Sequence, residues 1–256
     1  MEPTPLWAEE PPCPRLPRSL AELTPQWLTA ALGQTWPGVV VHSANLVETI
    51  RGASTKARIE LRTNRNDVPP CMIVKAGFEA HSDAMRPMHD NEMHAYRDLI
   101  PTIEINAPKC FFAGRDGDGH SLVIIEDLNL RGVHFLSLQQ PIGYDLAKAF
   151  LEGLARIHAR WWGSPELEGP RFSWVPDTSE EQFMHYFAIL ADPDRFEVFR
   201  SAPRGAAMPR VLLDPVRVRA AHAAMRAAHQ GKPMVISHGD MHLGNLYTDA
   251  DGTPAF

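Results

Sequence analysis

The closing stretch of the chain, VISHGDMHLGNLYTDADGTPAF at residues 235–256, is the part that decides the fold. A short apolar run and a turn-forming sequence enclose the polar segment HGDMHLGN. Within it, Asp240 precedes Asn245 by five residues, and His238 lies two residues before the aspartate. These side chains are candidates for catalysis or metal binding, and an ordinary polar turn before a hairpin is the alternative interpretation.

A carboxylate and an amide at this spacing suit phosphoryl transfer. Asp240 would accept the proton of an attacking hydroxyl, and the amide oxygen of Asn245 would hold a magnesium ion that bridges nucleotide phosphates. Protein kinases have the same spacing in H-R-D-x-x-x-x-N. His238 would then fix the loop by hydrogen bonds without transferring a proton. A dinuclear metal hydrolase could also use Asp240 and His242, but it needs several further ligands, and the residues after His242 supply only two aspartates in a turn.

The segment HGDMHLGN resembles the catalytic loop of the aminoglycoside phosphotransferase and choline kinase-like superfamily, whose motif is H-G-D-x-H-x-x-N. The resemblance covers most of the chain from about Val41 onward, and only this motif is highly specific. It implies an α+β, two-lobed protein-kinase-like fold, with an antiparallel-sheet N-lobe and a helical C-lobe. Gly239 replaces the arginine that clamps a phosphorylated activation loop, which favours a small-molecule kinase over a regulated protein kinase.

The resemblance assigns roles to two residues upstream. Met72, Ile73 and Val74 form an apolar strand that ends in Lys75, as in the V-A-I-K strand of kinases. Lys75 would hold the α- and β-phosphates, and Glu92, on a predicted helix, would pair with Lys75. Taken alone, such a lysine is usually a surface residue and such a glutamate is usually solvated.

Two further segments match the positions of nucleotide-binding parts. Residues 51–55, RGAST, lie between two predicted strands where a phosphate-covering loop is expected, and Ser54 would meet phosphate oxygens there. This turn is poor in glycine, and an ordinary hairpin is the alternative. Residues 122–128, LVIIEDL, resemble the linker between the lobes, where the backbone of Glu126 and Leu128 would bind adenine.

Changes in composition and in the spacing of apolar residues along the chain predict three regions. Residues 1–18 are acidic and rich in proline and are expected to form a loose arm. Residues 19–127 are the nucleotide-binding N-lobe, and residues 128–256 are a partial C-lobe with the catalytic loop and substrate-binding helices. The expected helices and strands, in chain order, are a helix at 20–33, strands at 39–50, 57–63 and 71–77, a helix at 88–100, a hairpin at 109–128, helices at 143–162, 180–190 and 214–231, and a short strand and hairpin around the closing motif.

The composition limits the classes of binding partner and the cellular compartment that we expect. The net charge of −6 and the lack of a basic block argue against nucleic acid. Cys13, Cys71 and Cys110 are too far apart to form a metal or redox motif, which indicates a reducing compartment. The N-terminus has no signal-peptide pattern, and no apolar run is long enough to cross a membrane. A cytoplasmic protein without a membrane partner is therefore expected, with its oligomeric state open.

The predicted activity is transfer of the γ-phosphoryl group of ATP, or another nucleoside triphosphate, with Mg²⁺ to a hydroxyl of a small molecule. Whether the acceptor is an aminoglycoside, choline, a sugar or a lipid alcohol stays open. The alternative is a pseudokinase that binds nucleotide without turnover, or a catalytically dead fragment. Kinases have a second magnesium ligand, the D-F-G aspartate. It is expected on the strand that follows the closing hairpin, and the sequence ends at Phe256, before such an aspartate. The sequence therefore predicts an incomplete C-lobe, and little nucleotide binding and no phosphate transfer by residues 1–256 alone.

Overall fold

The computed structural model describes residues 15–176 and 192–256. The chain divides into two compact units, the first formed by residues 1–161 together with 236–256 and the second by residues 162–235. The boundary predicted at residue 128 falls inside the first unit. The helix expected at 180–190, Cys13 and most of the predicted N-terminal arm lie outside the described residues. The antiparallel sheet and the helices give the α+β class that the sequence predicts.

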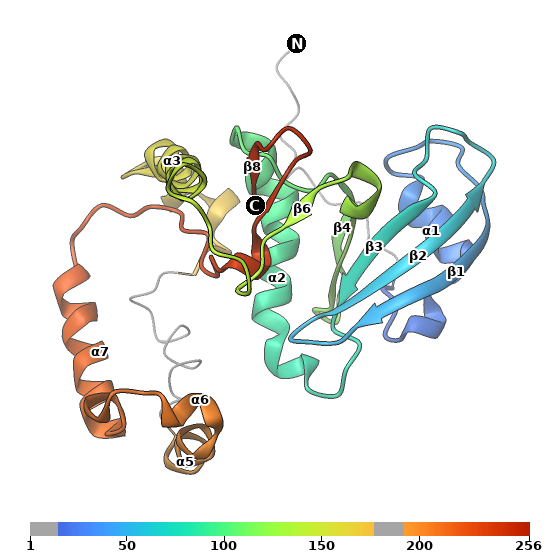
Figure 1. Cartoon of the computed structure of the whole chain (residues 1–256). Helices are drawn as coiled ribbons and strands as arrows, with labels where there is room; N and C mark the ends of the chain where they lie inside the picture. Colours follow the sequence, from blue (N-terminus) through green and yellow to red (C-terminus); the bar gives the residue numbers. More distant parts are fainter. Residues whose placement is uncertain (1–14, 177–191) are drawn as a thin grey trace. The chain divides into compact units, whose positions relative to one another are not determined.

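A five-stranded antiparallel sheet forms the centre of the first unit, in the order β1-β2-β3-β5-β4 (Figure 1). The strands are β1 Val41–Ile50, β2 Thr55–Thr63, β3 Cys71–Ala76, β4 Cys110–Arg115 and β5 Ser121–Glu126. β1, β2 and β3 form the predicted meander, and β4 and β5 form the predicted hairpin. Because side chains alternate between the two faces of each strand, each face has its own core.

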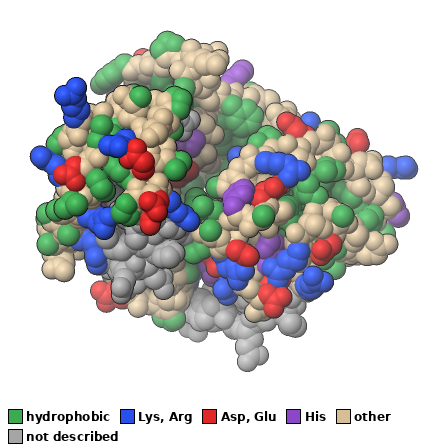
Figure 2. Space-filling model, turned by 90° about the horizontal axis from the view of Figure 1, so that it is seen from below, with side chains coloured by type: hydrophobic (Ala, Val, Ile, Leu, Met, Phe, Trp, Pro, Cys, Tyr) green, Lys and Arg blue, Asp and Glu red, His purple; other side chains and the backbone are tan. Residues whose placement is uncertain are grey.

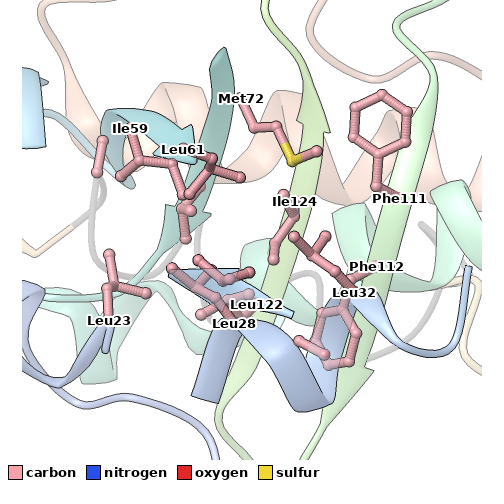
Figure 3. Close-up of a cluster of buried hydrophobic side chains, with 14 of the residues drawn as sticks. Leu23, Leu28, Leu32, Ile59, Leu61, Met72, Phe111, Phe112, Leu122 and Ile124 are labelled. Atoms are coloured by element: carbon pink, nitrogen blue, oxygen red, sulfur yellow. The ribbon is translucent and has the colours of Figure 1, made fainter. Parts of the chain in front are cut away.

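One face of the sheet packs against α1, Pro25–Leu32. The larger core lies here, and Figure 3 shows leucines of α1 in one cluster with strand side chains such as Leu122 and Ile124. The helix predicted from residue 20 begins later, since a separate 3-10 turn covers Leu20–Glu22. Thr24 caps α1 by accepting a hydrogen bond from the Trp27 N–H, and Pro25 fills the first turn, where no N–H is needed.

The opposite face packs against α2, Arg86–His94, which continues as a π-helical turn at Ala95–Leu99. Met93 is fully buried against Val123 and Ile125 of β5. Contacts of α2 with β4 and β5 hold the helix over this part of the sheet. Lys75 of β3 lies on this face, because Val74 and Ala76 on either side of it belong to the α1 core.

The packed part of the N-lobe begins before residue 19. Leu16 is fully buried in the α1 core, and its N–H donates to the Asp116 carboxylate over 3.2 Å. Arg18 forms ion pairs with Asp116 at 2.8 Å and with Asp118 at 3.0 Å. Residues 15–18 are therefore held by the β4–β5 turn, which the proline-rich sequence did not suggest.

A small second sheet carries the closing motif in the first unit. β6 His134–Phe135 pairs with β7 Tyr247–Thr248, and β7 pairs with β8 Pro254–Ala255. α3, Tyr144–Trp161, contacts β8, and a Cβ on its Gly153 would lie 2.8 Å from the Phe256 ring. The strand predicted just before the closing motif is absent, because residues 232–237 form no regular element.

In its described residues, 162–176 and 192–235, the second unit consists of helices and turns. Its elements are 3-10 turns at Pro165–Glu168, Pro170–Phe172 and Arg210–Leu212, and helices α5 Pro193–Ser201, α6 Pro203–Ala206 and α7 Pro215–His229. Asp214 caps α7 with hydrogen bonds from two backbone N–H groups, and Gly231 follows its end with φ +72°. The predicted helix at 214–231 is confirmed.

The described surface is mixed in charge. Figure 2 shows basic and acidic side chains interspersed over the face in view. Within residues 15–176 and 192–256, no helix is both long enough and apolar enough to span a bilayer. The two cysteines of these segments, Cys71 and Cys110, are free thiols.

Candidate active site

Lys75 and Glu92 meet on the α2 face of the sheet. Lys75 comes from β3 and Glu92 from α2, and the Lys75 Nζ and Glu92 Oε1 form an ion pair. Their side chains are 17% and 28% exposed, so both charges are partly withdrawn from water. The helix thus orients a lysine that would otherwise be free to move over the sheet.

Ser54 lies beside this ion pair. A cavity of about 10 Å³, room for about one water molecule, adjoins both charged side chains. Its lining residues are Ser54, Lys75, Ala76, His89, Glu92, Ser121, Leu122 and Val123. Three residues that the sequence assigns to nucleotide binding are therefore brought together, although they lie far apart in the chain.

Lys56 is a neighbour that the sequence analysis missed. It is the cross-strand partner of Lys75 in the β2–β3 ladder, so both side chains share one face. Desolvation lowers the pKa of Lys56, the nearby Lys75 lowers it further, and Glu92 acts in the opposite direction. A second ammonium group therefore stands next to Lys75. The alternation of Lys56, Arg58 and Glu60 with buried apolar residues was the available signal.

The predicted linker is fixed by backbone and side-chain contacts. The Glu126 N–H donates to the Lys109 carbonyl over 2.8 Å, and the Glu126 carboxylate accepts from the Lys109 N–H. Asp127, 1% exposed, pairs with Arg58 at 2.6 Å and caps the 3-10 turn that Leu128 begins. These contacts hold the backbone of Glu126 and Leu128 in place, and their role toward adenine stays a prediction.

Asp240 and Asn245 contact each other on the closing loop. The Asn245 Nδ2 donates to the Asp240 Oδ2 over 3.0 Å and to the Asp240 carbonyl over 2.9 Å. Gly239 supports this loop with φ +79°, a left-handed conformation that a side chain would strain. The Asp240 side chain is 71% exposed, so its carboxylate is open to a substrate hydroxyl.

The donor atoms of this loop fit a magnesium ion. Because the Asn245 Nδ2 is used by Asp240, its amide oxygen is left for a cation, and Mg²⁺ prefers hard oxygen ligands. No group of three or more His, Cys, Asp and Glu side chains suited to a metal gathers within the described segments. Magnesium does not need such a cage, because it keeps water and phosphate oxygens as ligands.

The two histidines of the motif shape the loop. His238 Nδ1 accepts the Asp240 N–H over 3.4 Å, and its ring lies 6.3 Å from the Phe256 ring, centroid to centroid. Desolvation lowers the pKa of His238, which favours the neutral ring that such an acceptor requires. His242 Nδ1 caps the following turn by accepting the Gly244 N–H over 3.0 Å. Both contacts match a structural role.

Arg131 joins the linker to the hairpin after the closing loop, and sequence analysis missed it. Its guanidinium contacts the Glu126 carboxylate at 2.9 Å, the Asp249 carboxylate at 2.7 Å and the Tyr247 hydroxyl at 3.2 Å. Asn106 bonds to both Arg131 and Asp249. No local motif marks such a residue, because its partner Asp249 lies 118 positions further along the chain.

The Lys75–Glu92 pair and the Asp240–Asn245 pair belong to the same unit but not to one bonded network. Across the described part of the chain, no hydrogen bond or ion pair joins them directly. A larger cavity of about 290 Å³ lies elsewhere, between Asn106, Gly153, Arg156 and Phe256. None of the predicted site residues lines it.

Known proteins resemble the chain in sequence and in fold. The model of the ecdysteroid kinase-like family matches residues 52–161, which include Ser54, Lys75, Glu92 and the linker. No curated protein matches the sequence. The solved complex of APH(2″)-IIIa with GDP and kanamycin is 14% identical, with a TM-score of 0.51 over 89% of this chain and 69% of its own. A GDP complex of a mutant aminoglycoside 2′-phosphotransferase-IIIa is 13% identical, with a TM-score of 0.47 over 90% and 68%.

Proposed function

Since this chain has a protein-kinase-like fold and resembles the kinase-like phosphotransferases, we propose that it transfers the γ-phosphoryl group of a nucleoside triphosphate, ATP in the first place, to a hydroxyl of a small molecule. The observation that carries the proposal is the contact between Asp240 and Asn245. The contact supports a joint role in which Asp240 is the proton acceptor and the Asn245 amide oxygen is a magnesium ligand. The GDP in the solved neighbour supports a nucleotide as the phosphate donor.

Each residue has a separate task in this reaction. Asp240 accepts the proton of the attacking hydroxyl, which makes the oxygen a better nucleophile. Lys75 draws the α- and β-phosphates into position, and Glu92 keeps the ammonium group directed. Asn245 would hold Mg²⁺, which neutralises charge on the phosphates when bound. Catalysis of this kind is mostly positioning and charge neutralisation.

The acceptor is proposed only as a class. The matching family is described as ecdysteroid kinase-like, and the solved neighbour was bound to kanamycin. Ecdysteroids and kanamycin are both small molecules with hydroxyl groups, and the Asp240 side chain is exposed to solvent. The cytoplasmic location expected from the cysteines is part of the same proposal, because the cytoplasm supplies nucleoside triphosphates.

A transfer assay tests the proposal. The protein is incubated with Mg²⁺ and γ-³²P-labelled ATP or GTP, together with an ecdysteroid, kanamycin, choline or a sugar. Samples with EDTA give the background. We expect a labelled product with at least one acceptor, formed over many turnovers. Nucleotide binding without any product from an extended acceptor panel would favour the pseudokinase alternative.

A further inference from the structure

The turn at residues 51–55 is fastened to the segment that connects β3 with α2. Glu79 holds the two ends of the turn, because its Oε1 pairs with Arg51 Nη1 at 2.5 Å and accepts from Thr55 Oγ1 over 3.2 Å. Both contacts lie outside the β-ladder between β1 and β2. A hairpin turn that only reverses the chain would not need them.

Two histidines hold the middle of the same turn. His81 Nε2 lies 2.9 Å from the Gly52 carbonyl oxygen, and His89 Nε2 lies 2.9 Å from the Ala53 carbonyl oxygen. A carbonyl oxygen can only accept, so each ring must donate from Nε2. Consecutive carbonyls of one turn are therefore bound by two side chains from outside it.

The packing around His89 indicates a built contact. The ring lies against Gly77, where a Cβ would be 2.9 Å from the His89 Cε1 and 2.7 Å from the Ser82 Cβ. Real Cβ atoms essentially never approach this closely, so any larger residue at position 77 would displace the ring. Glycine at this position lets the His89 ring reach the turn.

His89 also connects the turn to the Lys75–Glu92 pair. It lies one helical turn before Glu92 on α2 and lines the same small cavity as Ser54, Lys75 and Glu92. Ala53 and Ser54 share one planar peptide group, so fixing the Ala53 carbonyl also fixes the direction of the Ser54 N–H. The position of Ser54 beside Lys75 thus depends on the histidine.

We propose that His89, assisted by His81 and Glu79, is a positioning residue that holds residues 51–55 in the arrangement that binds the phosphates of a nucleoside triphosphate. This inference rests on the proposed function. His89 acts through the turn and not through the phosphates. Releasing the turn lowers the fraction of molecules that are ready to bind, so the apparent dissociation constant rises in proportion.

Two substitutions distinguish the effect of the His89 hydrogen-bond donor from the effect of its ring. His89→Phe keeps a flat ring against Gly77 but removes the donor, and His89→Gln keeps a donor in a side chain of similar reach. His42→Phe is the matched control, because His42 is exposed on β1 and lies outside the turn. Hydrogen exchange of residues 52–56 is measured without nucleotide, and Mg²⁺–AMP-PNP affinity is measured by titration calorimetry.

Loss of about one hydrogen bond should change affinity about fivefold. We expect His89→Phe to speed exchange in the turn and to raise the dissociation constant about fivefold, with kcat in the transfer assay within about twofold of wild type. His89→Gln and His42→Phe should stay near wild type. Wild-type exchange and affinity in His89→Phe, or equal losses in the Phe and Gln variants, would overturn the inference. Failure of the wild-type protein to bind Mg²⁺–AMP-PNP would instead overturn the proposed function, while the exchange data would still report whether His89 holds the turn.

Discussion

Lys75 owes its orientation to the two-residue period of β3. Met72 and Val74 are fully buried in the α1 core, and Lys75 therefore points to the other face, where Glu92 meets it. A shift of one residue in the pairing would place the ammonium group in the apolar core. The apolar residues before Lys75 thus pack the sheet against α1 and also direct the Lys75 side chain to the opposite face.

Removal of this charge should weaken nucleotide binding. We expect Lys75→Ala to raise the dissociation constant of ATP or to lower kcat/KM at least tenfold, about 1.4 kcal/mol. Glu92→Gln should have a smaller effect, because it orients the lysine without contacting phosphate. Lys148→Ala is the control, since its side chain is 59% exposed on α3. Wild-type binding and kinetics in Lys75→Ala would contradict the role of the pair.

Arg131 shows how one short element can order another that is distant in sequence. The 3-10 turn Leu128–Arg131 follows the linker, and Gly132 after it has φ +69°. Arg131 then reaches Asp249 and Tyr247 in the hairpin that follows Asn245. Burial raises the pKa of Tyr247 to about 12 against the opposing effect of Arg131, so its hydroxyl stays protonated at neutral pH. The linker and the closing loop are therefore tied into one framework.

Replacing the Arg131 guanidinium by a lysine ammonium group should destabilise the first unit. Arg131→Lys keeps the charge but loses the planar fork that serves several acceptors at once. We expect a loss of about 1–3 kcal/mol in the free energy of unfolding, measured by urea denaturation. Arg65→Lys, in an exposed pair with Asp67, should leave the free energy of unfolding near that of wild type. Equal losses in the two variants would show that Arg131 is an ordinary surface arginine.

Local features of the site could be predicted from the sequence, and distant contacts could not. Asp240 and Asn245 lie on one loop, so their spacing alone indicated that they belong to one site. The strand before Lys75 and the helix with Glu92 followed from hydrophobic periodicity. The Arg131–Asp249 contact and the burial of Leu16 depend on the complete fold. The late start of α1 reflects Thr24 and Pro25, which override the apolar pattern before them.

The candidate site as a whole is assembled in the first unit from segments that the chain brings back together. Residues 51–55, Lys75, Glu92 and the linker come from residues 1–161, and the closing loop comes from residues 236–256. Residues 162–235, which form the second unit, lie between them in sequence. A site divided in this way depends on both parts of the first unit. In the proposed reaction the earlier segments bind the nucleotide, and Asp240 of the closing loop supplies the proton acceptor.

The most direct test of that role of Asp240 is the comparison of phosphoryl transfer and nucleotide affinity in wild type and Asp240→Asn. Asparagine keeps the size of the side chain but cannot accept the proton of the attacking hydroxyl. The account predicts a kcat lower by about 10²-fold or more, within the range for general base catalysis, with the Mg²⁺–ATP dissociation constant within about threefold of wild type. An unaltered kcat in Asp240→Asn would contradict it and would place the proton acceptor elsewhere.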